Sequence, residues 1–261
     1  MKNVLLYGGG TQSTGLLLMS LDGLVPKLDL AIFSDTFSEP GFVYEYMNKV
    51  SAYVLSKYGF KIVTVEHGNL ERNLEESAKS GKRVASLPYY TENGGMTMRQ
   101  CTADYKINPA SKFIKAYFNI GRKKKHSAPT INRWFGMSLD EIERMRVSQD
   151  WWAVNEYPLI MERMYRHEVI NYINNNHPEL KNPPRSACYF CPFHSNDYWR
   201  LLKKHHPDEF NKACIMDGKI RVCRNMENER YLHRSMKPLS DINFEKDNYE
   251  IFAECEGYCG M

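Results

Sequence analysis

The sequence predicts an α/β fold with a doubly wound, mainly parallel sheet of about five strands. Short apolar runs typical of buried strands alternate with longer amphipathic stretches typical of helices over residues 3–65. A glycine-rich turn follows the first apolar run directly. Alternation at these lengths is typical of parallel strands that are joined by right-handed helical crossovers.

The positions of the apolar runs predict the individual elements. We expect strands at residues 3–7, 28–33, 61–65 and 130–135. We expect helices at residues 13–20, 40–58, 112–118, 161–174 and 196–205. The polar, glycine-containing stretch 68–98 predicts an irregular loop. Ser138 followed by Glu141 has the form of a capped helix start. Met161, Met164 and Trp199 fit helical apolar faces and are expected in the core.

Length and composition indicate an ordered protein of two parts. With 261 residues, 43% hydrophobic and 25% charged, the chain leaves little room for long disorder. We expect an α/β domain over residues 1–150 and a mostly helical, cysteine-containing region over 151–261. No run of 18 apolar residues occurs, so we expect a cytoplasmic protein without a membrane partner.

The glycine-rich turn predicts a phosphate-binding loop. Such a turn between a strand and a helix exposes backbone N–H groups and places a bound phosphate at the positive helix end. A purely structural tight turn is the alternative. The expected nucleotide-binding residues are Tyr7, Gly8, Gly9, Gly10, Thr11, Gln12, Ser13 and Thr14.

The loop resembles the Ser-Gly-Gly-x-Asp-Ser signature of the PP-loop ATP pyrophosphatases, which include phosphoadenylylsulfate (PAPS) reductases and tRNA-thiolating enzymes. Gly8 replaces the first serine and Gln12 replaces the aspartate. Residues 34–39 resemble the segment beside the nucleotide in the PAPS reductase branch. The resemblance implies binding of ATP with Mg²⁺ and catalytic roles for Ser13 and Gln12. It also adds Ser34, Asp35 and Thr36 to the nucleotide site, although Asp35 could instead be a helix cap.

The cysteines predict thiolate chemistry. Seven cysteines, two of them in Cys188-x-x-Cys191, suit metal or cluster ligation better than a disulfide framework. The segment around Cys101 resembles the Cys-Cys-x-x-x-Lys-x-x-Pro region of iron–sulfur sulfonucleotide reductases, with Gln100 in place of the first cysteine. This resemblance implies a 4Fe-4S cluster on three cysteines, as in the iron–sulfur tRNA thiolases. Zn²⁺ completed by His194 or a tail cysteine, and unliganded thiols, remain alternatives.

The tail and two arginines supply further candidates. The ending around Cys255 resembles the Glu-Cys-Gly terminus whose cysteine attacks the sulfonucleotide in the reductases, which implies a catalytic Cys255. A disulfide with Cys259 or a metal ligand is the alternative. Arg144 and Arg185 are candidate anion clamps, or else surface ion pairs. Cys214 and Cys223 are expected in the core.

Together these features predict an enzyme that binds ATP, adenylates a substrate carbonyl oxygen and releases pyrophosphate. The expected acceptor is a base of tRNA or DNA that receives sulfur, and the basic stretch 122–126 would meet the nucleic acid. A sulfur donor or reductant protein is an expected partner. One alternative is a reductase that acts on PAPS or adenylylsulfate (APS) through Cys255. Another is a non-catalytic nucleotide-binding or zinc-stabilised subunit.

Overall fold

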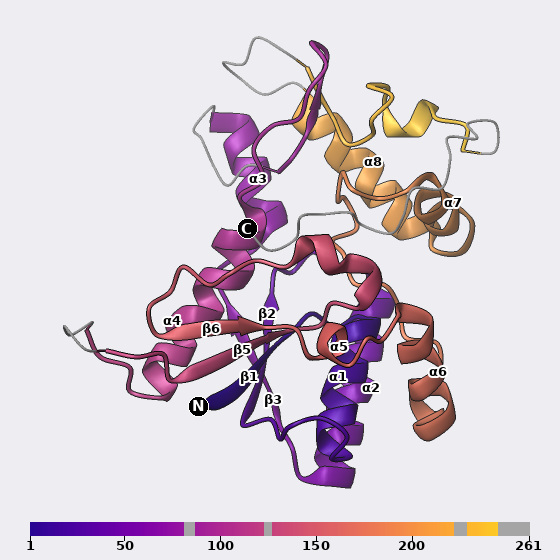
Figure 1. Ribbon diagram of the computed structural model, residues 1–261. Coiled ribbons are helices and arrows are strands. Elements are labelled where there is room, and N and C mark those ends of the chain that lie inside the picture. Colours follow the sequence, from indigo (N-terminus) through magenta and orange to yellow (C-terminus); the bar gives the residue numbers. More distant parts are fainter. Residues whose placement is uncertain (81–86, 123–126, 222–228, 245–261) are drawn as a thin grey trace.

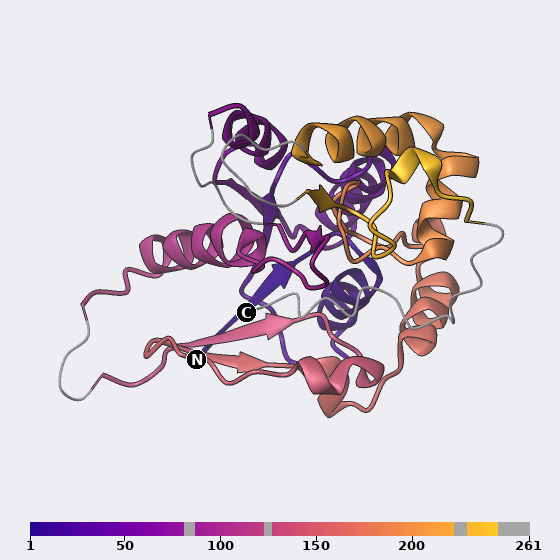
Figure 2. The same cartoon turned by 90° about the horizontal axis from the view of Figure 1, so that it is seen from above.

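The computed structural model describes residues 1–80, 87–122, 127–221 and 229–244. Five parallel strands form its central sheet in the order β3-β2-β1-β5-β6 (Figures 1 and 2). They are β1 (Lys2–Tyr7), β2 (Leu30–Asp35), β3 (Ile62–Glu66), β5 (Ile131–Phe135) and β6 (Ala153–Glu156). The strand order changes direction at β1, so the connections that follow β1 and β5 diverge and leave room for a site. The predicted α/β class with a mainly parallel sheet is therefore confirmed.

Helices and short turns of helix make up most of the remaining described chain. The helices are α1 (Thr11–Leu21), α2 (Gly41–Tyr58), α3 (Leu70–Ser80), α4 (Asn108–Tyr117), α5 (Pro158–Met161), α6 (Arg166–Asn176), α7 (Asn196–His205) and α8 (Pro207–Arg221). A π-helix spans Ala103–Ile107, and 3-10 helices span Leu139–Arg144, Pro178–Leu180 and Leu239–Asp241. β4 (Tyr90–Thr91) pairs antiparallel with β7 (Arg230–Tyr231).

The sheet is covered on both faces because its side chains alternate between two cores. One face packs on α1, α2 and α6 through Leu5, Ala31 and Phe33. The opposite face packs on α4 through Val4, Leu30 and Ile32. Since both faces are buried, the strands are apolar at successive positions. These continuous apolar runs are the pattern from which the strands were predicted.

A third core lies over the sheet, where α3, α7 and α8 gather at the top of Figure 1. It buries Leu70 and Leu74 of α3 together with Trp199 of α7 and Phe210 of α8. The expectation that Trp199 is a core residue is confirmed, and Cys214 packs against the same core. This core takes residues from both predicted domains, and the boundary at residue 150 remains a prediction.

Several local expectations are wrong. Residues 68–98 contain helix α3, whose buried Leu70, Leu74 and Ala78 recur every four residues within a charged stretch. A continuous helix at 161–174 does not form, because Arg163 adopts a left-handed conformation with φ 55° between α5 and α6. Met161 is 71% exposed rather than buried, whereas Met164 packs against the core. Helix α8 and strand β6 were not expected.

The expectation for Ser138 is met only in part, and the expectation for Cys223 concerns a residue outside the described chain. Ser138 precedes a 3-10 helix, but its side chain makes no capping hydrogen bond. Cys223 lies outside the described residues. None of the helices in the described part of the chain is long and apolar enough to cross a bilayer.

Candidate functional site

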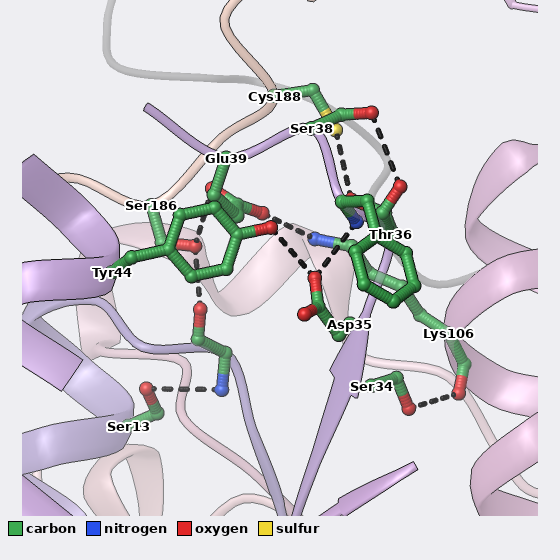
Figure 3. Close-up of polar contacts among 12 residues, drawn as sticks. Ser13, Ser34, Asp35, Thr36, Ser38, Glu39, Tyr44, Lys106, Ser186 and Cys188 are labelled. Carbon is green, nitrogen blue, oxygen red and sulfur yellow. Dashed lines mark hydrogen bonds and ion pairs between the residues drawn. The ribbon is translucent and has the colours of Figure 1, made fainter. Parts of the chain in front are cut away.

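The glycine-rich loop joins β1 to α1 in a tight turn. Gly9 has a φ of 78°, a conformation that side chains with a Cβ atom rarely adopt, and Gly10 is the N-cap of α1. The Ser13 hydroxyl accepts from the Gly8 N–H and donates to the Gly10 carbonyl, at 3.2 Å in each case. The loop is therefore held closed by its own side chain (Figure 3). The loop leads directly into the eleven-residue helix α1, so the positive amino end of the helix lies at the loop.

Gly136, directly after β5, lets the neighbouring strand end approach the loop. A Cβ atom at this position would lie 2.6 Å from the Ser13 nitrogen and 2.7 Å from its Cα. Only a glycine fits such a close approach without a backbone shift. No pattern in the sequence predicted this packing role for Gly136.

A cavity of about 230 Å³ opens beside the loop. Its described lining includes loop residues Gly8 to Ser13 except Gly9, apolar side chains such as Ile32, Phe33 and Met137, and six charged side chains. The charged side chains are Arg99, Lys106, Arg144, Arg166, Arg185 and Glu141. Because five cations accompany one carboxylate, the cavity suits an anionic ligand.

Arg144 and Gln12 meet at Glu141. The Arg144 guanidinium forms an ion pair with the Glu141 carboxylate, and the Gln12 amide donates to the same carboxylate at 3.0 Å. This contact ties the 3-10 helix to the loop. The Arg144 Nε atom is buried and has no hydrogen-bond partner among the described residues, so the side chain retains a donor that a ligand could use.

Arg166 and Arg185 approach the loop from two other segments. Arg166 donates to the Thr11 hydroxyl at 3.3 Å. The Arg185 guanidinium lies over the Tyr198 ring, with its carbon 5.6 Å from the ring centroid, and its Nη2 atom is buried without a partner. A buried unpaired guanidinium nitrogen is costly, and an anion in the cavity would relieve that cost. The structure thus brings both predicted anion-binding arginines to the loop.

The predicted segment after β2 is only partly at the cavity. Ser34 lines it, whereas the described lining residues do not include Asp35 or Thr36. The Asp35 carboxylate accepts from the Phe37 N–H at 2.7 Å and from the Tyr44 hydroxyl at 2.6 Å (Figure 3). Burial, together with the bond to Asp35, raises the pKa of Tyr44. Asp35 thus organises the turn before α2, and its role beside a nucleoside remains a prediction.

The Cys188–Cys191 segment forms a turn in which the Cys191 N–H donates to the Cys188 carbonyl at 2.9 Å. Burial, and then the nearby Glu39 carboxylate, raises the pKa of the Cys188 thiol to about 12. The His194 Nε2 atom lies 2.8 Å from the Cys188 carbonyl and donates to it, since a carbonyl oxygen can only accept. Burial, and then the nearby Arg185, lowers the pKa of His194 to about 3.

Cys101, Cys188 and Cys191, the three cysteines predicted as ligands, all lie in the described part of the chain. Among the described residues, no three histidine, cysteine, aspartate or glutamate side chains are grouped closely enough to hold a metal ion. Ligation by Cys101, Cys188 and Cys191 remains a prediction. Cys255, Cys259 and residues 123–126 lie outside the described chain.

Sequence reasoning did not assign several charged residues that the structure brings to the site. Lys106 lines the cavity, and its ammonium pairs with the buried Glu39 carboxylate at 3.2 Å. Lys106 and Arg99 belong to the segment around Cys101. Its resemblance to the Cys-Cys-x-x-x-Lys-x-x-Pro region includes a lysine, but neither residue was predicted to line the site. Arg166 had no local signal, because its contact with Thr11 spans 155 residues.

The chain matches no protein-family profile and no curated protein sequence. Two solved structures align with it. A PAPS reductase from Candida auris, in its phosphate complex, aligns at 17% identity with a TM-score of 0.41, over 67% of this chain and 71% of that chain. The U34-tRNA thiolase NcsA from Methanococcus maripaludis, with its 4Fe-4S cluster, aligns at 16% identity with a TM-score of 0.41, over 87% and 73%.

Proposed function

We propose that the cavity binds the phosphate groups of an adenine nucleotide, with ATP as the expected ligand. The observation that carries the proposal is the meeting of the glycine loop with Arg144 and Arg185, each of which has a buried nitrogen atom without a partner. Backbone N–H groups at a helix start and forked guanidinium groups are the donors that phosphates prefer. The apolar lining from Ile32, Phe33 and Met137 suits a nucleoside.

The proposed reaction is adenylation followed by sulfur transfer. A carbonyl oxygen of a tRNA or DNA base would attack the α-phosphorus of ATP, and pyrophosphate would leave. A sulfur nucleophile from a donor protein would then attack the carbonyl carbon, and AMP would leave with the former carbonyl oxygen. Ser13 and Gln12 are the proposed catalytic residues of the loop. Mg²⁺ would accompany ATP and neutralise its phosphates, and Glu141 is a carboxylate in the cavity lining that could bind it.

Calorimetric titration with ATP, AMP and pyrophosphate tests the binding step. We expect ATP and pyrophosphate to bind more tightly than AMP, because the loop and arginines recognise the polyphosphate. Arg144→Ala should weaken ATP binding about tenfold, since it removes one of the cations that line the cavity. Arg146→Ala is the matched control, because Arg146 is two residues away and is not among the described lining residues. Equal affinity for all three ligands would contradict the proposal.

A sulfonucleotide reductase is the second candidate. The presence of glutamine rather than aspartate at position 12 favours it. The loop position that carries aspartate in the resembled signature holds an amide, which is bonded to Glu141. In this reaction Cys255 would attack the sulfate sulfur of PAPS or APS, forming an S-sulfocysteine and releasing the adenosine phosphate. A thiol reductant protein would then release sulfite. Tighter binding of a sulfonucleotide than of ATP, with nucleotide release, would establish this candidate. Binding without turnover of either nucleotide would indicate a non-catalytic subunit.

A further inference from the structure

Glu39 lies beside the candidate site without being among the described residues that line the cavity. Its side chain is 1% exposed, and its two carboxylate oxygens have different partners. One accepts from the Lys106 ammonium at 3.2 Å, and the other lies 3.2 Å from the Ser186 hydroxyl (Figure 3). A buried carboxylate with these partners fixes both side chains in place.

Ser186 connects Glu39 to the phosphate loop. Its hydroxyl also lies within hydrogen-bond distance of the Gly8 carbonyl, at the carboxyl end of β1. A Cβ atom on Gly10 would lie only 3.2 Å from the nitrogen and the Cβ of Ser186, so this segment packs directly on the loop. Gly8 is thus held by two serines. The Gly8 N–H donates to the Ser13 hydroxyl, and the Gly8 carbonyl accepts from the Ser186 hydroxyl.

The same segment continues into the cysteine turn two residues later. The Cys188 sulfur lies 3.7 Å from the Thr36 hydroxyl, and the Tyr189 N–H donates to the Ser38 carbonyl at 2.9 Å. Residues 186–189 are therefore attached both to the phosphate loop and to the connection between β2 and α2 that carries Glu39. The Cys188 turn and the Ser186 contact with Gly8 are thus only two residues apart on one short segment.

We propose that Glu39 and Ser186 are positioning residues that couple the Cys188 turn to anion binding at the phosphate loop. The coupling rests on the proposed nucleotide binding and adds a regulatory link to it. Chemical modification of Cys188 weakens nucleotide binding, and by thermodynamic reciprocity bound nucleotide protects Cys188. Because Cys188 does not line the cavity, the protection acts through the connecting residues and not by direct cover.

The first test compares ATP affinity in wild type and in Glu39→Gln. Removal of a negative charge from a cation-rich region would by itself strengthen anion binding. Loss of positioning weakens it, and we expect about five- to tenfold weaker binding. Glu209→Gln is the matched control, since Glu209 accepts from the Gly41 N–H at the start of α2 and lies outside the cavity lining. Unchanged or tighter binding in Glu39→Gln overturns the positioning role.

The second test measures the alkylation rate of Cys188 by iodoacetamide, with tandem mass spectrometry to distinguish it from Cys191. ATP should slow the reaction of Cys188 at least about fivefold in wild type. Cys214 on α8 serves as an internal control whose rate should not respond to ATP. In Ser186→Ala the protection of Cys188 should be lost. Equal rates with and without ATP in wild type, or full protection in Ser186→Ala, overturn the coupling.

The outcomes separate this inference from the proposed function. Failure of the wild-type protein to bind ATP overturns both. Binding of ATP without protection of Cys188 overturns only the coupling. If neither variant folds, as judged by circular dichroism, the wild-type protection experiment decides the question alone.

Discussion

The charged and polar side chains at the two ends of helix α1 differ in how far they are paired within the protein. At its amino end, cationic side chains surround the phosphate loop, and Arg144 and Arg185 keep buried nitrogen atoms without partners. At its carboxyl end a compact polar cluster forms, which we call the Asp22 cluster. Its members are Asp22, Tyr53, Lys57, Tyr58, Tyr172 and His177.

The Asp22 cluster is internally paired. The Asp22 carboxylate, at the C-cap of α1, accepts from the Tyr58 and Tyr172 hydroxyls and from His177 Nε2 at 3.0 Å. The Tyr53 hydroxyl donates to His177 Nδ1 at 3.0 Å and accepts from Lys57. A carboxylate at the negative end of a helix is unfavourable by itself, and these donors offset that cost.

The difference indicates what each region contributes. Donors that are used within the folded protein stabilise it, as in the Asp22 cluster. Donors that remain unpaired in a cavity destabilise the free protein and are available to a ligand. Substitutions at the amino end of α1 should therefore change ligand binding more than stability, and substitutions at the carboxyl end should do the reverse.

Arg185→Ala should give the largest effect on the binding side of this comparison. We expect ATP affinity to fall about 10–100-fold, because a hydrogen bond to a charged group contributes about 1.5–3 kcal/mol. The melting temperature should change little, since the contact of Arg185 with the Tyr198 ring that is lost is a weak one. Calorimetry and thermal unfolding measure the two quantities. Arg72→Ala, at an exposed ion pair on α3, is the control for charge. A large loss of stability with unchanged ATP affinity would show that Arg185 serves stability and not ligand binding.

Gly136→Ala should weaken both properties, because it affects the frame of the loop. The added methyl group must displace the Ser13 backbone, at a cost of about 1–3 kcal/mol in the free energy of unfolding. Denaturant unfolding and ATP titration would measure the two losses. A variant with wild-type values for both would show that the close approach of β5 to the loop does not matter.

His177→Gln should affect stability and its pH dependence without affecting ATP binding. Burial lowers the pKa of His177 from its ordinary value of 6.5, although Asp22 opposes the shift. The folded state thus favours the neutral ring, so wild-type stability is retained above pH 6.5 and falls as the pH drops below that value. The variant should lose about 1 kcal/mol at pH 7.5 and show a flatter profile from pH 7 to 5. Denaturant unfolding across this range tests it, and parallel profiles would contradict it.

Asp22 should extend the acid sensitivity to lower pH. Burial alone would raise the pKa of Asp22, but hydrogen bonds from Tyr172 and Tyr58 and the proximity of His177 lower it from 3.8. The stability that this carboxylate contributes is present above pH 3.8 and is lost as the pH falls through its lowered folded-state value. The wild-type acid profile should therefore have a second, lower phase that is absent in Asp22→Asn.

Gly218→Ala, on the exposed face of α8 and remote from both regions, should give the smallest effect. Within the described part of the chain, no neighbouring group lies within 4 Å of the position that a Cβ atom would take. Alanine is favoured over glycine inside a helix by about 0.5–1 kcal/mol, so a slight stabilisation is expected. Thermal unfolding tests it, and a destabilisation would indicate a constraint on α8 that its surroundings do not show.

The sequence alone predicted the features that depend on local order. Alternating apolar runs located β1, β2, β3 and β5, and the boundaries of α7 agreed at both ends with the expected 196–205. The glycine loop was readable because its conformation depends on adjacent residues. Helix α3 was missed because three buried positions recur within a stretch of mostly charged residues, and β6 was missed because it has only four residues.

Tertiary structure alone decided what surrounds the loop. Glu141 reaches Gln12 across 129 residues, Arg166 reaches Thr11 across 155, and Ser186 reaches Gly8 across 178. Residue type predicted that Arg144 and Arg185 could bind an anion, but only the parallel sheet order brings them to one cavity. Such contacts depend on which strand ends lie next to each other in the sheet. Packing of the whole chain determines that order, and the local sequence pattern does not predict it.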